Sequence, residues 1–543
     1  MDGSQAVAEI LKREGVKYAF CFPFTPILDA LAAAEIRPVV ARQERVAENM
    51  ADGFSRIHSG RDFGVITVQQ AAGAENAFSG IAHAKTDSSP VLFLPGHPGT
   101  NFVGVSPTFD GVENYRATTK WADRIPSACQ ISQRLRRAYT KLRSGRPGPV
   151  MLEIPVDVAQ SNLPEPLEYS SPKALRTAGD PTTIVDACRL MRAAERPMIW
   201  AGQGVLYAQA SDQLTQLAER LDAPVMTTLL GKSAINEQHR LALGTGSYSA
   251  TQMVKDYLQR CDTIIAVGAS LTKTVFAPPI PAGKRIIHIT NDVTDIHKDY
   301  ASDVAILGDA QLVLDQVLTE LNELAENPIV RESEREFVVA VRSNWVNRWR
   351  DKLASNETPL NPYRVIHEMM QATDPNNCIV THDSGNPRDQ LVPIYEATVP
   401  RSYIGWGHST QLGFSLGASM GAKLADPTKD VIHFLGDAAF GMVGMDVETA
   451  VREEIPILTV LLNNSAMGNY EKNIPIASER YSTKFLSGNY AEVARGLGAW
   501  SKRVEQPQEI GPAFKEALKQ TRDGHPALLE FITCEEPDMA IGY

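Results

Sequence analysis

The stretch 431–464 reads VIHFLGDAAFGMVGMDVETAVREEIPILTVLLNN and predicts one βαβ unit. Val431 to Leu435 and Pro456 to Leu462 are short apolar runs, which is typical of buried parallel strands. Between them, Val447, Ala450 and Val451 follow helical spacing and mark the buried side of a helix. The unit therefore indicates an α/β domain with a parallel sheet.

Polar side chains follow both strands of this unit. Asp437 comes after the first strand and Asn464 closes the second, 464 − 437 = 27 positions later. A right-handed crossover of that length returns the second strand beside the first, so we expect the carboxylate and the carboxamide to meet at one sheet edge. Hard oxygen ligands at that edge suit a Mg²⁺ ion that holds a diphosphate, and the small residues Ala438 and Ala439 are expected to leave backbone N–H groups open.

Composition excludes several classes of partner. The chain has 543 residues and a net charge of −11 without a basic block, which argues against nucleic acid and anionic membranes as partners. It contains no apolar run of the ~18 residues that a membrane span needs. Six cysteines without a CxxC pair fit a reducing compartment, and the N-terminus lacks the apolar core of a signal peptide, so we expect a cytoplasmic location.

The alternation of helices and strands predicts three Rossmann-like, doubly wound parallel-sheet domains of the α/β class. We place them at residues 1–165, 181–325 and 360–535. The segment 161–181 is rich in Pro, Ser and charge and is predicted to be a linker, and 312–358 is predicted to be a charged helical connection. Strands are expected near 18–22, 39–40, 65–68, 90–95, 145–158, 198–201, 224–227, 263–267, 286–289 and 378–380, and middle-domain helices near 207–221 and 250–260.

The run RQERVAENMADGFSR, residues 42–56, together with the Gly-Asp opening and Asn-Asn close of 431–464, resembles a known family. It is similar to the thiamine diphosphate-dependent enzymes of the acetolactate synthase, pyruvate oxidase and benzoylformate decarboxylase group. Ala438 stands where glycine is usual, and Gln43 where histidine is common. The resemblance implies that Glu44 is catalytic and hydrogen-bonds N1′ of the aminopyrimidine; without that context it would be an ordinary glutamate at a helix start.

The same resemblance implies a cofactor site of thiamine diphosphate and Mg²⁺. The metal ligands are then Asp437, Asn464 and the backbone carbonyl of Ala466, and Leu412 supports the bent cofactor. The cofactor-binding residues expected on this basis are Glu44, Gly385, Asn386, His408, Leu412, Gly436, Asp437, Ala438, Ala439, Asn464, Ala466, Met467 and Gly468.

Substrate-facing residues are expected where the chain departs from its relatives. Phe24 and Thr25 replace a usual Gly-Gly or Gly-Ser, Gln69 stands at a position where some decarboxylases carry histidine, and Phe109 lies where synthases often show Phe-Gln. Gln69 can donate and accept hydrogen bonds but cannot carry a proton at neutral pH.

The implied reaction is decarboxylation of a 2-oxo acid, carboligation through an enamine intermediate, or both, as in acetolactate synthase. A C–C lyase similar to 2-hydroxyacyl-CoA lyase or oxalyl-CoA decarboxylase is the alternative, and a non-catalytic cofactor-binding paralogue is a third reading. The middle-domain stretch AGQGVLYA lacks the third glycine of the dinucleotide fingerprint. Dinucleotide binding is therefore not supported by this stretch. Residues 268–285 differ from the pattern of the FAD-binding synthases that the chain resembles, so FAD is not expected, whereas a CoA nucleotide remains open. The family pattern further implies a homodimer or homotetramer with its active sites at the dimer interface.

Overall fold

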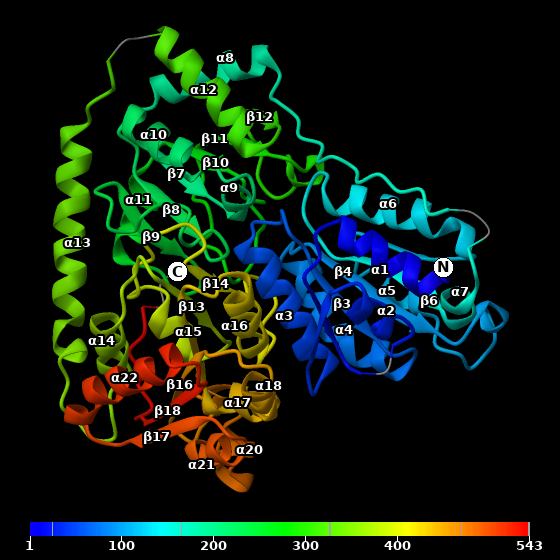
Figure 1. The fold of residues 1–543 in the computed structure, drawn as a ribbon. Coiled ribbons are helices and arrows are strands. Elements are labelled where there is room, and N and C mark those ends of the chain that lie inside the picture. Colours follow the sequence, from blue (N-terminus) through cyan, green and yellow to red (C-terminus); the bar gives the residue numbers. More distant parts are fainter. Residues whose placement is uncertain (24, 164–165, 325–326, 469, 541–543) are drawn as a thin grey trace.

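Three parallel six-stranded sheets follow one another along the chain (Figure 1). The computed structural model describes residues 1–23, 25–163, 166–324, 327–468 and 470–540. Helices cover both faces of each sheet, and apolar side chains fill the layers between helices and strands. The predicted fold class, three Rossmann-like α/β domains, is confirmed; the exact domain limits given above stay a prediction.

The first sheet has the strand order β2-β1-β3-β4-β6-β5. Its strands are β1 (Tyr18–Cys21), β2 (Arg37–Val40), β3 (Gly64–Val68), β4 (Val91–His97), β5 (Trp121–Arg124) and β6 (Val150–Pro155). Its helices are α1 (Gly3–Arg13), α2 (Leu28–Ala33), α3 (Glu44–Ile57), α4 (Ala72–Thr86), α5 (Gly111–Tyr115), α6 (Ile131–Leu142) and α7 (Val156–Gln160). Strands β1, β3, β4 and β6 are nearly continuous apolar runs, as expected for strands that are buried on both faces.

The middle sheet has the order β12-β11-β10-β7-β8-β9, which is the Rossmann order with its switch point between β7 and β10. Its strands are β7 (Pro197–Ala201), β8 (Val225–Thr228), β9 (Ala242–Gly246), β10 (Thr263–Val267), β11 (Arg285–Thr290) and β12 (Val304–Leu307). Its helices are α8 (Pro181–Ala193), α9 (Gln203–Tyr207), α10 (Ser211–Leu221), α11 (Gln252–Arg260) and α12 (Ala310–Leu324). The long helix α13 (Glu332–Leu353) then runs along the molecule to the third domain (Figure 1).

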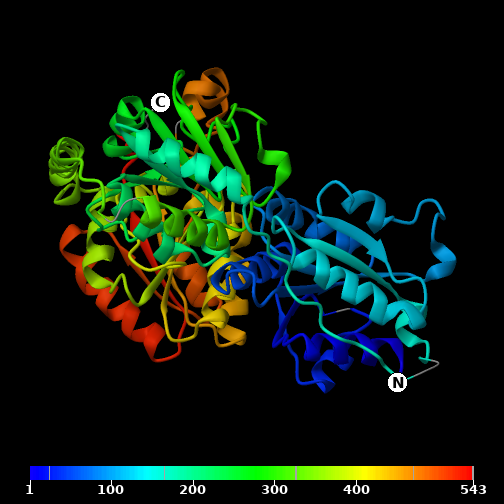
Figure 2. The ribbon, with the colours of Figure 1, turned by 90° about the horizontal axis from the view of Figure 1, so that it is seen from above.

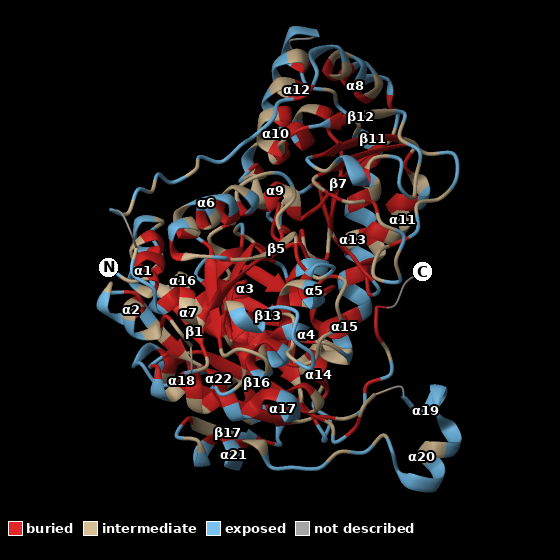
Figure 3. Cartoon of the chain, turned by 90° about the vertical axis from the view of Figure 1, so that its right-hand side faces the viewer, coloured by how far each residue is buried: buried red, intermediate tan, exposed pale blue. Residues whose placement is uncertain are grey.

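The third sheet repeats the strand order of the first, as β14-β13-β15-β16-β18-β17. Its strands are β13 (Cys378–His382), β14 (Tyr403–Gly405), β15 (Asp430–Gly436), β16 (Leu458–Asn463), β17 (Trp500–Val504) and β18 (Ala527–Ile532). Its helices are α14 (Pro362–Ala372), α15 (Asn386–Leu391), α16 (Phe414–Ala425), α17 (Asp437–Val443), α18 (Val447–Arg452), α19 (Tyr470–Asn473), α20 (Pro475–Tyr481), α21 (Tyr490–Gly496) and α22 (Pro507–Arg522). Helices α19 and α20 project from the body of this domain and are largely exposed (Figure 3).

Several predicted elements need correction. The single crossover helix expected inside 431–464 is broken into α17, a 3₁₀ turn at Gly444–Asp446, and α18. The helix expected near 207–221 begins later, at Ser211, as α10, and the short helix α9 ends at Tyr207. Only part of 145–158 is a strand, because α7 follows β6 directly. Helix α12, at the start of the predicted connection 312–358, packs into the middle-domain core and is no part of a linker.

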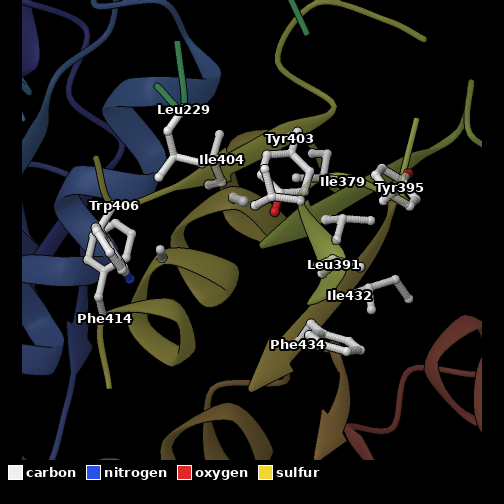
Figure 4. Close-up of a cluster of buried hydrophobic side chains, with 14 of the residues drawn as sticks. Leu229, Ile379, Leu391, Tyr395, Tyr403, Ile404, Trp406, Phe414, Ile432 and Phe434 are labelled. Atoms are coloured by element: carbon white, nitrogen blue, oxygen red, sulfur yellow. The ribbon is translucent and has the colours of Figure 1, made fainter. Parts of the chain in front are cut away.

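The first and third domains meet through α3 and α16, which approach so closely that only glycine fits at the contact. A Cβ atom at Gly421 would lie 2.0 Å from the carbonyl oxygen of Met50, and one at Gly53 would lie 2.3 Å from that of Ala418. Figure 2 shows the first domain beside the other two, with this contact at the junction. The core of the third domain continues to Leu229 of the middle domain, whose side chain reaches the cluster around Trp406 and Phe414 (Figure 4).

Candidate functional site

A cavity of about 330 Å³ opens where β13, β15 and β16 end. Gly436 pairs with Leu462 in the sheet, so the residues that follow them, Asp437 and Asn464, leave neighbouring strands side by side. Both line the cavity. Nine further residues that the sequence assigned to the cofactor line it as well: Gly385, Asn386, Leu412, Gly436, Ala438, Ala439, Ala466, Met467 and Gly468.

Asp437 has an environment that suits a cation. Its side chain is 3% exposed, and its Oδ1 atom accepts a hydrogen bond from the backbone N–H of Ala438 at 2.9 Å. Its Oδ2 atom is buried and has no hydrogen-bond partner among the described residues. Burial raises the pKa of this carboxyl group to about 6. A bound cation would satisfy the orphaned oxygen and stabilise the charged form, so the residue fits a metal ligand.

The expectation of open backbone N–H groups beside Asp437 is only partly met, because the N–H of Ala438 is already used by the aspartate itself. The described part of the chain contains no group of three or more His, Cys, Asp or Glu that could hold a metal by itself. A magnesium ion at Asp437 would therefore complete its shell with amide, carbonyl and phosphate oxygens.

The two asparagines that close β16 have different surroundings. Asn463 turns into the domain, where its Nδ2 atom donates to Glu530 Oε1 at 2.7 Å. Asn464 lines the cavity, and its Oδ1 atom accepts from the backbone N–H of Ala466 at 3.1 Å, which shapes the turn that carries Ala466 into the same cavity.

Glycines also line the cavity. Gly385 has a φ of +97°, which a residue with a Cβ rarely adopts. A Cβ at Gly468 would lie only 2.2 Å from Nδ2 of Asn386, so this position also requires glycine. Because these two positions have no side chain, a diphosphate can approach their backbone closely.

Asp383 positions the segment that carries Leu412 and is not itself among the described residues that line the cavity. Its fully buried carboxylate accepts hydrogen bonds from the backbone of Gly413 at 2.9 Å and from the backbone of Ser415 at 3.0 Å. These bonds hold the start of α16 against β13, and Leu412 lies two residues before that start. No local sequence pattern indicates this positioning role of Asp383.

Glu44 lies at the first position of α3 and is 7% exposed. Its Oε2 atom accepts a hydrogen bond from Nδ2 of Asn76 at 3.2 Å. A Cβ at Gly73 would lie 3.0 Å from Cβ of Gln69 and 3.6 Å from Oε1 of Glu44, so Gln69 and Glu44 flank the same glycine in the first turn of α4. Glu44 is not among the described residues that line the 330 Å³ cavity of its own chain.

The remaining predicted substrate residues have varied positions. Thr25 is half-buried, and its Oγ1 atom is buried without a partner among the described residues. Phe109 is half-buried before α5 and packs against the large core. Phe24 lies outside the described residues.

His408 lines a second, larger cavity of about 1000 Å³ that lies between the three domains. The backbone N–H groups of Gly407 and His408 donate to the buried carboxylate of Asp87 at 2.8 and 2.9 Å. The cavity lies at the carboxyl ends of β7, β10, β11 and β12, and residues 171–177 of the predicted linker form part of its wall. Among the described residues, His408 therefore lines this larger cavity and not the 330 Å³ cavity at the ends of β15 and β16.

Comparisons with known proteins agree with this arrangement of domains. The family models match residues 1–120 to the thiamine pyrophosphate enzyme N-terminal TPP binding domain, 184–317 to the central domain and 383–531 to the C-terminal TPP binding domain.

Within the described residues, no helix has both the length and the apolar character that a membrane crossing requires.

Curated relatives match over almost the whole chain. A probable acetolactate synthase large subunit from Methanocaldococcus jannaschii is 31% identical, over 98% of this chain and 92% of the relative. A protein of the same description from Methanococcus aeolicus is 30% identical, over 98% and 92%. The acetolactate synthase isozyme 3 large subunit from Escherichia coli is 30% identical, over 96% and 93%. Three matched domains and these relatives show that the chain belongs to the thiamine pyrophosphate enzyme family, in the group that includes the acetolactate synthases.

Proposed function

We propose that this enzyme catalyses the thiamine diphosphate- and Mg²⁺-dependent decarboxylation of a 2-oxo acid and the joining of the resulting fragment to a second carbonyl compound, as an acetolactate synthase does. The observation that carries the proposal is the cavity at the ends of β15 and β16, where the orphaned Oδ2 of Asp437 and the amide of Asn464 lie against a glycine wall. The names of the relatives supply the reaction type.

The residues divide into two groups by role. Asp437, Asn464 and the carbonyl of Ala466 would hold Mg²⁺, and the backbone around Gly385 and Gly468 would hold the diphosphate. When bound, thiamine diphosphate would supply a nucleophilic carbon for the substrate carbonyl and a ring that serves as the electron sink when CO₂ leaves. Glu44 would exchange a proton with the pyrimidine ring, and Asn76 would orient its carboxylate.

We infer that the active site is shared between two chains. Glu44 is not among the residues that line the cavity of its own chain, so a second chain would have to supply it. Large apolar side chains are exposed near both parts of the site, at Phe78, Phe102, Val103 and Val105 in the first domain and at Met442, Met445, Tyr470, Ile474, Ile476 and Phe485 in the third. A homodimer, or a tetramer of two such dimers, would cover these surfaces.

A panel of 2-oxo acids tests the proposed reaction. The purified enzyme, loaded with thiamine diphosphate and Mg²⁺, is given each acid alone and with an aldehyde or second 2-oxo acid, and CO₂ release and products are measured. Release of CO₂ with a joined product supports the proposal, and release of an aldehyde alone reassigns the enzyme as a simple decarboxylase. The absence of both across the panel would favour a non-catalytic paralogue, against which the presence of Glu44, Asp437 and Asn464 argues.

The interdomain cavity favours one second candidate, a lyase that acts on CoA thioesters. Its volume of about 1000 Å³ and its position at the switch point of the middle sheet fit a nucleotide. A thermal shift with CoA and with ADP separates the candidates, since the lyase needs stabilisation by both. FAD, for which the sequence gives no fingerprint, serves as a third ligand in the same assay.

The cytoplasmic location stays a prediction.

A further inference from the structure

Arg388 is a buried cation with unused hydrogen-bonding capacity. The side chain is 4% exposed and lies in the first turn of α15. Its Nε atom donates to Oδ1 of Asp389 at 2.8 Å, and Nη2 donates to the same oxygen. Its Nη1 atom is buried and has no hydrogen-bond partner in the described part of the chain. A buried donor without a partner is costly, so the position calls for an acceptor that the chain alone does not supply.

The position of Arg388 relates this donor to the candidate active site. Arg388 and Asp437 are the charged residues among those described along the 330 Å³ cavity, one basic and one acidic. Asp437 lies at the end of β15, where the metal is proposed, whereas Arg388 lies against the aromatic wall formed by Trp406 and Phe276. Its guanidinium carbon is 4.5 Å from the ring centroid of Trp406 and 5.5 Å from that of Phe276.

The aromatic wall keeps the guanidinium in place. Phe276 of the middle domain and Trp406 of the third domain contact each other edge to face, with ring centroids 5.2 Å apart. The guanidinium of Arg388 lies against both rings. Stacking of this kind restrains an arginine without using its N–H groups. The pair with Asp389 restrains the other side, so Nη1 is left as a pre-oriented donor.

We propose that Nη1 of Arg388 binds an oxyanion in this cavity, and that the oxyanion is the carboxylate of the 2-oxo acid substrate. Charge-assisted hydrogen bonds from arginine to a carboxylate or phosphate are among the strong ones in proteins. The diphosphate of the cofactor is the other source of the same chemistry. The assignment to the substrate rests on the proposed function, in which Mg²⁺ and the backbone around Gly385 and Gly468 already bind the diphosphate and the donor of Arg388 is left for a second anion.

The test compares two conservative variants with a matched control. Arg388→Lys keeps the charge but loses the planar fork, and Arg388→Gln removes the charge while leaving a donor for Asp389. Arg401→Gln is the control, because Arg401 is also buried, also has a nitrogen without a partner among the described residues, and is not among the described residues along this cavity. Thermal unfolding of all three variants measures what the loss of a buried guanidinium costs in stability alone.

We expect Arg388→Gln to raise KM for the 2-oxo acid about ten- to a hundredfold, with kcat changed less, and Arg388→Lys to have a smaller effect. The affinity for thiamine diphosphate with Mg²⁺, measured by calorimetry, should be unchanged, as should KM for a neutral aldehyde acceptor. The control should change none of these constants. A loss of stability without a change in KM would assign Arg388 a structural role and overturn the proposal.

Two further outcomes have clear meanings. A weakened affinity for thiamine diphosphate with an unchanged KM would assign the oxyanion to the cofactor and overturn the substrate assignment. A titration with an acylphosphonate, which carries the negative charge but cannot lose CO₂, needs no turnover. If the wild-type enzyme binds it and Arg388→Gln does not, the anion site stands even where the substrate panel fails; if both bind it equally, the anion site is wrong.

Discussion

Asp437 combines burial, an orphaned oxygen and a raised pKa at the point where the metal is proposed. Glu44, by contrast, is a buried carboxylate with an amide partner, Asn76. These two residues therefore support different experiments, one on metal binding and pH and one on proton exchange.

Asp437 should make the cofactor-free protein less stable as the pH rises. Its pKa is about 6 in the folded protein and ~3.9 in an unfolded chain. The folded state thus holds a proton that the unfolded state has lost, so this contribution to the free energy of unfolding is present below about pH 4 and disappears through about pH 6. Comparison of urea unfolding of wild type and Asp437→Asn at pH 4.5 and 7 isolates this contribution, which is at most about 3 kcal/mol.

The same titration should govern metal binding. Mg²⁺ requires the carboxylate, so the joint affinity for Mg²⁺ and thiamine diphosphate should fall about tenfold for each pH unit below 6 in the wild type. Calorimetry between pH 5 and 7.5 measures this slope. An affinity that does not change across this range, in a protein that remains folded, would remove Asp437 from the metal site.

Glu44→Gln should slow exchange of the C2 proton of bound thiamine diphosphate by orders of magnitude while the cofactor still binds, because an amide cannot exchange a proton with the pyrimidine. Exchange is followed by NMR after quenching in acid. Glu48→Gln is the matched control: Glu48 lies one turn further along α3, is fully buried and bonds to Asn49. Equal rates for wild type and Glu44→Gln would exclude Glu44 from the proton exchange.

Helices α3 and α16 join the two domains that carry these groups. Helix α3 begins at Glu44, and α16 begins two residues after Leu412. The contact between the two helices therefore fixes the position of Glu44 relative to Leu412 within one chain. Glycines make the contact possible, since at Gly421 and Gly53 a Cβ would collide with backbone of the opposite helix.

Gly421→Ala should destabilise the protein by about 1–3 kcal/mol or more, because its Cβ would lie 2.0 Å from the carbonyl oxygen of Met50, and backbone cannot yield as a side chain can. Thermal and urea unfolding measure the loss. Gly496→Ala is the control, since this exposed residue of α21 has no atom within 4 Å of the new Cβ and should be neutral or slightly stabilising. Equal stability of the two variants would show that the helices can separate without cost.

The whole molecule determines whether one chain can make an active site. Each domain of the chain has a complete sheet, yet Glu44 does not line the cavity that contains Asp437 and Asn464. A symmetric dimer would have two active sites, and in each of them Glu44 of one chain would lie opposite Asp437 of the other.

Mixing two inactive variants tests this arrangement. Glu44→Gln and Asp437→Asn chains, denatured together and refolded, should regain about a quarter of the wild-type activity, because half the dimers are mixed and one of their two sites is intact. Each variant refolded alone should stay inactive, as should a mixture of Glu44→Gln with the double variant. If the mixture of the two single variants is no more active than its components, both residues serve a site within one chain.

Much of the fold could be predicted from the sequence because central parallel strands are continuous apolar runs. The elements that were missed lie mostly at sheet edges: β5, β9, β12, β14 and β17 end their sheets, and β5 and β17 carry charged residues that resemble loop sequence. Strand β18 is internal and apolar, so its periodicity could have revealed it. The broken crossover at Gly444–Asp446 was missed because Val447 and Ala450 keep helical spacing beyond the break.

By itself, the sequence determined the α/β class, the three domains and the proximity of Asp437 and Asn464, since these depend on local periodicity and on the direction in which parallel strands end. Only the tertiary structure decided that Asn463 bonds to Glu530, that Asp383 holds Gly413, that His408 lines a different cavity, and that Arg388 has an unused donor. The physical reason is that hydrogen-bond partners and burial depend on residues that are distant in the chain, and no local pattern encodes them.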